Sequence, residues 1–458
     1  MFMEFEEYMS SLTEQIHDKR AKHLVAEEIR NHIEEQANDY EAEGLSPAEA
    51  LKEAVRQMGN PIETGMELNK IHKPRIPWAM LALAIFIMTA SIVMQAVIFA
   101  EGGNSNSSWA GLPSTIIYNC LGFAVILVLL YMDYNFIAKY AYQFYGVFMA
   151  GLPVVLFVVK LFSEVGRVTA GTAYYGVQLL FPILFAGIIY KNRNRGIRGI
   201  GICLMFGFAE LLWYRMVYEV IGTTGRYSCY PALVESILSI GLILLFAVWK
   251  GIFGKDKKKQ VVLLLVIAGV LSAICMLLLW GSGGMRHYVL ARVAAFFRGT
   301  EDSYLSTLIQ KSVSDAPWLG GQTFLLGEPN GETYGLFVLN SIFTYFGKLA
   351  GVIVIAAYLL FLCMALRTSC KQNNRIGFLI GTVCTLSILV RFTAYLAINL
   401  GFGLWWTTLV PFLSYGRVSA VMNGIYIGLI LCVYRNSGIL KEEYVPQKRL
   451  PRIRVTVE

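Results

Sequence analysis

The chain has 458 residues, of which 56% are hydrophobic and 15% are charged. Average soluble domains are about 25% charged, so this composition excludes intrinsic disorder and most soluble enzymes. The net charge of +8 is unevenly divided: residues 1–75 carry nine Lys or Arg against sixteen Asp or Glu, and the remainder carries 30 against 15. We therefore expect an acidic head and a basic, membrane-embedded body.

Helix signals cover the acidic head at residues 1–75. Residues 4–16 and 21–43 have helical composition. Ser46 then provides an N-cap, with Pro at the first helical position and Glu49 at the third, which is a typical helix start. The first ten residues, MFMEFEEYMS, lead into no apolar h-region, so we expect no cleaved signal peptide.

The segment SPAEALKEAVRQMGNPIETGMELN at the end of the head resembles the helical prefix domain found ahead of some bacterial permeases. This resemblance implies a cytosolic domain with a regulatory or partner-binding role and no catalysis. The alternative interpretation is a solvated acidic helical hairpin with no chemistry.

Ten apolar segments follow, each close to the roughly 20 residues that a membrane-spanning helix needs. We predict an all-α fold: a polytopic membrane protein of about ten transmembrane helices at residues 76–436, with a basic tail at 437–458. The spans are predicted near 77–100, 113–133, 142–163, 173–190, 197–218, 231–250, 261–281, 346–366, 376–400 and 415–434. No internal repeat is evident, which disfavours an inverted-repeat transporter.

Basic residues alternate between the short loops. Loops on one side hold clusters at 191–198, 255–259 and 367–375, whereas the opposite loops hold none or a single Arg. By the positive-inside rule, both termini face the cytosol, and a bacterial plasma membrane is the expected location. The Lys255–Lys259 cluster also favours contact with anionic lipids.

One outer loop, at residues 282–345, is 64 residues long, and loops of that length in compact proteins are usually functional or disordered. It is rich in aromatic and basic residues and is not of low complexity, so we expect it to fold against the membrane surface. Residues 303–314 have the pattern of an amphipathic helix.

This loop and the last two spans resemble the SEDS proteins, the shape, elongation, division and sporulation family that includes FtsW, RodA and SpoVE. "YVLARVAAFF" and "YLSTLIQKSVSDAPWLGG" are similar to the family's Y…R…F and YQ…QS…A…GG…G stretches. "NRIGFLIGTVCTLSILVRFTAYLAINLG" is similar to its ninth span, and "VPFLSYGRVSAVMN" to its LPF-x-SYGGSS…N signature. The likeness covers roughly residues 77–435, and its last third is the specific part.

The resemblance implies polymerisation of glycan strands from lipid II, the lipid-linked peptidoglycan precursor, together with a transpeptidase of the penicillin-binding class. Such a reaction needs a carboxylate base for the attacking sugar hydroxyl and cations for the departing diphosphate. The family's characteristic Asp, in P-E-x-H-T-D-F-I-F, falls here on Tyr334 or near Leu336 of "EPNGETYGLFVLN". Glu332 and Glu328 are the nearest carboxylates and the candidate catalytic bases, with solvated loop residues as the alternative.

Substrate-binding candidates follow from the same resemblance. Arg292 matches the family's Arg and is expected to face the diphosphate, with an interfacial Arg as the alternative. Lys311 is a second basic candidate in the loop, with an interfacial location favoured. Ser414, Tyr415 and Gly416 match the signature, with a structural turn as the alternative, and Arg417 is either a phosphate ligand or an interfacial anchor.

Ionisable residues inside the spans are the other functional candidates, because they are costly to bury. Glu210 and Arg215 are five residues apart, which is not the spacing of an i,i+4 ion pair. Arg391 lies well inside the ninth span and Glu235 lies in the sixth. A Glu235–Arg391 pair across helices would satisfy both charges, either as a structural pair or as the lining of a polar cavity.

The sequence contains no Walker lysine, HExxH motif or Cys/His cluster, and its eight cysteines form no CxxC pair. We expect no metal, no cofactor and no nucleic-acid partner. Three functions remain open: a SEDS-like protein of peptidoglycan synthesis that transfers glycosyl groups from lipid II, an inactive SEDS scaffold for a wall-synthesis partner, and a lipid or solute transporter.

Overall fold

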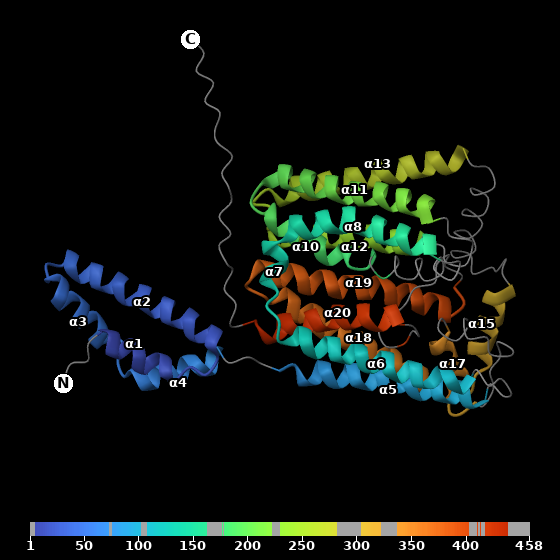
Figure 1. Ribbon diagram of the computed structural model, residues 1–458, viewed down its shortest axis with the longest axis horizontal. Helices are drawn as coiled ribbons and strands as arrows, with labels where there is room; N and C mark the ends of the chain where they lie inside the picture. Colours follow the sequence, from blue (N-terminus) through green and yellow to red (C-terminus); the bar gives the residue numbers. More distant parts are fainter. Residues whose placement is uncertain are drawn as a thin grey trace, which may run out of the picture. The chain divides into compact units, whose positions relative to one another are not determined.

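The protein is described by a computed structural model, which contains helices and no strands over the residues that it describes. These residues are 5–72, 76–101, 108–162, 176, 178–221, 230–281, 304–321, 337–402, 410, 413 and 417–437. The chain divides into two compact units, with a boundary between Pro77 and Trp78. Figure 1 shows both units as helices, and the all-α prediction is confirmed.

The first unit is a small four-helix domain. Its helices are α1 (Phe5–Glu14), α2 (Lys19–Ala42), α3 (Pro47–Gln57) and α4 (Pro61–His72). They enclose a core of buried apolar side chains that includes Tyr8, Leu12, Val25, Ile33 and Ala54. Three of the helices match the predicted segments within a few residues.

The fourth helix, α4, was not predicted, because Gly59-Asn60-Pro61 is a helix stop as well as a helix start. The side chain of Asn60 accepts a hydrogen bond from the Ile62 N–H at 3.0 Å, and Pro61 occupies the first helical position. Gly65 brings α4 against α1, since a Cβ at this position would lie 2.6 Å from the Leu12 carbonyl oxygen.

The start of α3 is fixed by Ser46 and Glu49. The Ser46 hydroxyl donates to Oε2 of Glu49 at 2.6 Å, and the Ser46 N–H reaches the same oxygen at 3.4 Å. The side-chain bond from Ser46, followed by its backbone bond, lowers the pKa of Glu49. Both bonds stabilise the ionised carboxylate at the helix N-terminus, where the helix dipole also favours negative charge.

We expect Ser46→Ala to reduce the protection of the α3 amides from hydrogen exchange at neutral pH. A lowered pKa in the folded state contributes stability above the ordinary Glu pKa of about 4.3, and that contribution is lost as the pH falls through the lowered value. The difference between variant and wild type should therefore narrow below about pH 4. Exposed Ser10 on α1 is the control for Ser→Ala. Equal α3 protection at neutral pH would contradict the prediction.

The second unit contains the membrane helices. They are α5 (Trp78–Glu101), α6 (Ser108–Leu130), α8 (Ala141–Phe162), α10 (Phe181–Lys191), α11 (Gly196–Ile221), α12 (Tyr230–Lys250), α13 (Lys257–Gly281), α18 (Lys348–Cys370), α19 (Arg375–Asn399) and α20 (Arg417–Arg435). Each predicted span coincides with one of them. Among the described residues, four helices are long and apolar enough to cross a membrane: α5, α11, α18 and α19. The protein is thus a multi-pass membrane protein.

Helix α19 is the buried axis of this unit. It packs against α10, α12, α17 (Val338–Tyr345) and α18, and it lies among α10, α12 and α18 in Figure 1. Its most apolar stretch is 83% buried, against 33% for the other three candidate spans. Most side chains in this stretch of α19 therefore lie in the protein interior, whereas most of those in the apolar stretches of α5, α11 and α18 do not.

The predicted fourth span, 173–190, is described only in part, because residues 173–175 and 177 lie outside the described residues. Helix α10 begins at Phe181, with Pro182 in its first turn. The carbonyl of Leu179 accepts a hydrogen bond from the Tyr426 hydroxyl of α20. The Tyr426 hydroxyl thus satisfies a carbonyl just before α10. A contact of this kind cannot be predicted from the length of an apolar segment.

The outer loop contains two short helices. The predicted amphipathic helix is confirmed as α15 (Tyr304–Asp315), whereas α17 was not predicted and is buried along most of its length. The Gly321 N–H donates to the Tyr345 carbonyl at 2.8 Å and the Lys348 N–H to the Pro317 carbonyl at 2.9 Å. These bonds fasten the end of α15 to the junction between α17 and α18.

We expect Gly321→Ala to disrupt this junction. A Cβ on Gly321 would lie 1.8 Å from the Thr344 carbonyl oxygen, a backbone atom that cannot yield as a side chain does. The purified variant should melt several degrees below wild type. Gly201→Ala on α11, where a Cβ meets nothing within 4 Å, is the matched control and should be neutral or slightly stabilising. A wild-type melting temperature for Gly321→Ala would contradict the close approach of Gly321 to the Thr344 carbonyl.

Candidate functional site

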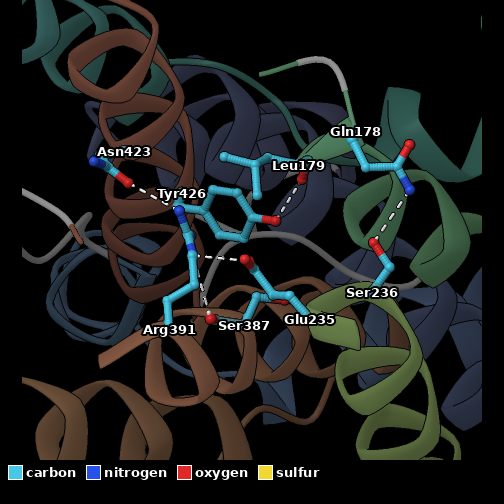
Figure 2. A network of polar contacts seen from close by, with 8 residues as sticks. All are labelled: Gln178, Leu179, Glu235, Ser236, Ser387, Arg391, Asn423 and Tyr426. Carbon is cyan, nitrogen blue, oxygen red and sulfur yellow. Dashed lines mark hydrogen bonds and ion pairs between the residues drawn. The ribbon is translucent and has the colours of Figure 1, made fainter. Parts of the chain in front are cut away.

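A buried ion pair joins two membrane helices. Nε of Arg391 on α19 lies 3.0 Å from Oε1 of Glu235 on α12 (Figure 2). The Arg391 side chain is fully buried and that of Glu235 is 4% exposed. The Glu235–Arg391 contact expected from the sequence is therefore present.

Arg391 also connects α19 to α20. Its Nη1 donates to Oδ1 of Asn423 at 3.0 Å, and its Nε also donates to the Ser387 carbonyl at 3.3 Å. The guanidinium carbon lies 4.4 Å from the ring centre of Tyr426, a cation–π distance. Since the Tyr426 hydroxyl bonds to Leu179, one cation links α12, α19, α20 and the approach to α10.

The energetic demand of this arrangement is large. Removing one partner of a buried ion pair typically costs about 3–5 kcal/mol, because the other charge stays buried without compensation. Replacing both partners by apolar residues is often neutral. The pair is therefore a constraint on the packing of the four elements around it.

We expect Arg391→Met and Glu235→Leu each to destabilise the purified protein by about 3–5 kcal/mol, and the double variant to recover most of that loss. The reason is that each single variant strands one charge in the interior. Thermal unfolding in one detergent, read as a double-mutant cycle, gives the coupling. Additive losses would show that the two charges do not depend on each other.

A second buried carboxyl lies on α11. Glu210 on α11 is fully buried and accepts a hydrogen bond from Nε2 of Gln178. The same nitrogen donates to the Ser236 hydroxyl at 3.3 Å, and Ser236 follows Glu235 on α12 (Figure 2). The sequence analysis weighed Glu210 against Arg215 and missed Gln178, for which a polar residue just before an apolar helix was the available signal.

A third polar cluster holds the outer helices against α19. The Asn340 N–H donates to Oδ1 of Asn399 at 2.9 Å, and the Asn340 amide donates to Ser312 of α15 at 3.0 Å. The Leu339 N–H donates to the Tyr395 hydroxyl at 3.3 Å. We call Ser312, Asn340, Tyr395 and Asn399 the outer platform. Through Tyr395, this cluster satisfies a backbone donor of α17.

The structure describes only some of the predicted catalytic and substrate-binding residues. Lys311 is exposed on α15, and Arg417 opens α20 with its side chain outside the described part. Six other candidates lie outside the described residues: Arg292, Glu328, Glu332, Ser414, Tyr415 and Gly416. Glu235 and Arg391 are thus the two predicted residues whose side chains the described structure brings together. Within the described residues, no group of three His, Cys, Asp or Glu could hold a metal ion.

Solved structures share this fold. No protein-family model and no curated protein matches the sequence. A chain from a peptidoglycan synthase complex, studied for the structural coordination of polymerization and crosslinking, aligns over 79% of this chain and 98% of its own, with 14% identity and a TM-score of 0.57. The Thermus thermophilus rod shape determining protein RodA aligns over 79% and 97%, with 13% identity and a TM-score of 0.48. This chain therefore shares the fold of the chain from the peptidoglycan synthase complex.

Proposed function

We propose that this protein is a SEDS-like membrane protein of peptidoglycan synthesis that transfers glycosyl groups from lipid II. The observation that carries the proposal is the fold likeness to nearly the whole of a chain from a peptidoglycan synthase complex. The motifs of the last two spans support it independently, because they resemble the SEDS signature in sequence. The proposed function assigns the protein to cell shape, division or sporulation.

The chemistry places the base in the segment that joins α15 to α17. A sugar hydroxyl that attacks an anomeric carbon must lose its proton to a carboxylate in reach, and Glu332 and Glu328 lie between Gly321 and Phe337. Both ends of this segment are fastened, by the Gly321–Tyr345 bond and by the Leu339–Tyr395 bond. A short, anchored segment favours a defined position for a catalytic side chain.

Cations complete the site. The departing lipid diphosphate develops negative charge, which Arg292 is proposed to neutralise, with Lys311 and Arg417 as further contacts on the same outer side. Ser414, Tyr415 and Gly416 precede Arg417 and would form the turn that presents it.

A transpeptidase of the penicillin-binding class is the proposed partner, because the matched complex coordinates polymerization with crosslinking. We place the protein in a bacterial plasma membrane with both termini in the cytosol. Anionic lipids are proposed to contact Lys255–Lys259, which are exposed at the start of α13. The head at residues 1–75 is then a cytosolic regulatory domain.

The test is polymerisation of labelled lipid II by the purified protein, with and without a cognate transpeptidase. We expect glycan strands, and Glu332→Gln should lower their rate by about 100-fold or more if this residue is the base. Glu328→Gln tests the second candidate, and exposed Glu67→Gln in the head is the control for the charge change.

The other results are equally informative. Wild-type rates in both loop variants would remove Glu332 and Glu328 as bases. Binding of lipid II without strands, in every condition, would favour an inactive scaffold. Absence of binding by folded protein would overturn the proposed function.

A further inference from the structure

The described part of the membrane unit buries two acids and two bases. Among the described residues of this unit, the buried charged side chains are Arg193, Glu210, Glu235 and Arg391. Arg193 lies just after α10, where its guanidinium stacks on Tyr190. Arg391 is bonded to Glu235. The side chain of Arg215, on the same helix as Glu210, lies outside the described part.

Glu210 is the buried carboxyl that has no charged partner among the described side chains. Its Oε1 accepts from Gln178, and its Oε2 is buried with no hydrogen-bond partner among the described residues. Oε1 of Gln178 is buried in the same way. An ionised carboxylate in a low-dielectric interior requires a compensating positive charge.

Three polar side chains meet at this point. The Gln178 amide bridges the Glu210 carboxylate to the Ser236 hydroxyl, and all three side chains are at least 97% buried. A half-turn of the amide would present its oxygen in place of its nitrogen to the same two groups. Carboxylate, amide and hydroxyl oxygens are the ligands preferred by small, hard cations.

We propose that Glu210, with Gln178 and Ser236, forms a buried binding site for a monovalent cation, either Na⁺ or a proton. Both sources supply a single positive charge to the Glu210 carboxyl. The site goes beyond the proposed function and can be tested without any cell-wall precursor. It is linked to the Glu235–Arg391 pair through the adjacent residues Glu235 and Ser236 of α12.

The titratable groups around Glu210 come from the helices that pack on α11. Helix α8 contributes Tyr145, whose hydroxyl donates to the Phe206 carbonyl at 3.1 Å. Helix α12 contributes Glu235, which is bonded to Arg391. Helix α11 itself carries Cys203, and the described α13 residues 261–269 carry no titratable side chain. Substitution of Glu210 therefore tests whether a cation binds at this carboxyl.

The experiment uses the purified full chain in phospholipid nanodiscs, at constant ionic strength, with NaCl exchanged for N-methyl-D-glucamine chloride. One arm measures the melting temperature against Na⁺ concentration. If Na⁺ is the ligand, the midpoint should rise by several degrees in wild type, because a ligand that binds only the folded state stabilises it, and should not respond in Glu210→Gln.

The second arm records the infrared carbonyl stretch of a protonated carboxyl at neutral pH without Na⁺. If the proton is the ligand, wild type should show this band and Glu210→Gln should lack it. Loss of the band on adding NaCl would show that the two cations exchange at one site. Exposed Glu67→Gln serves as the control and should behave as wild type in both arms.

A second variant guards against misfolding of Glu210→Gln. Gln178→Leu retains the carboxyl and removes the amide, so it should raise the Na⁺ concentration for half the stabilisation by about tenfold or shift the infrared band. The proposal is overturned if wild type shows neither a Na⁺ response nor the protonated band. It is also overturned if either signal persists unchanged in folded Glu210→Gln.

Discussion

The membrane unit depends on one constraint: a guanidinium buried at the axis of a helical bundle must be fully compensated. Arg391 meets this demand through a carboxylate on α12, an amide on α20 and a carbonyl on its own helix. Each contact fixes the rotation and depth of one helix relative to α19. Tyr426 extends the effect, because it stacks on the cation and holds the Leu179 carbonyl that precedes α10. A polar group thus specifies which apolar helices are neighbours, where hydrophobic burial alone would accept many arrangements.

Helix α19 also holds α17, through hydrogen bonds at its C-terminal end. At its end, Tyr395 and Asn399 accept the N–H groups of Leu339 and Asn340, which are the free donors at the start of α17. Helix α19 therefore determines both the interior packing and the position of the segment that follows α15. A change at either end of α19 should be felt at the other through the rigidity of a helix that is buried along most of its length.

Sequence reasoning predicted what depends on local composition. Hydropathy located the ten membrane helices, and amphipathic periodicity located α15. The Glu235–Arg391 contact was predictable because an unpaired charge inside a membrane is costly, so opposite charges there are usually paired. Three features were missed because they depend on tertiary contacts. Helix α17 is short and apolar, so its sequence does not distinguish it from the span that follows. The Leu179 carbonyl just before α10 is bonded to Tyr426. Gln178 bonds to Glu210, which lies 32 residues further along the chain. The Asn60 cap of α4 is a fourth missed feature, although its residues are visible in the sequence.

The two classes of carboxyl in this chain meet different physical demands, and this separates their roles. A catalytic base must exchange protons with a sugar hydroxyl of a polar substrate. Of the carboxyls in this chain, we propose Glu328 and Glu332 for that role, which belong in sequence to the segment between α15 and α17. Glu210 and Glu235 are buried among helices and directed at protein partners. A hydroxyl of a bulky glycan cannot reach them without separating α12 from α19. For the proposed glycosyl transfer, a carboxyl of the segment between α15 and α17 is therefore a better candidate base than either intramembrane Glu. The interior carboxyls remain available for a small cation, which needs no opening wider than itself.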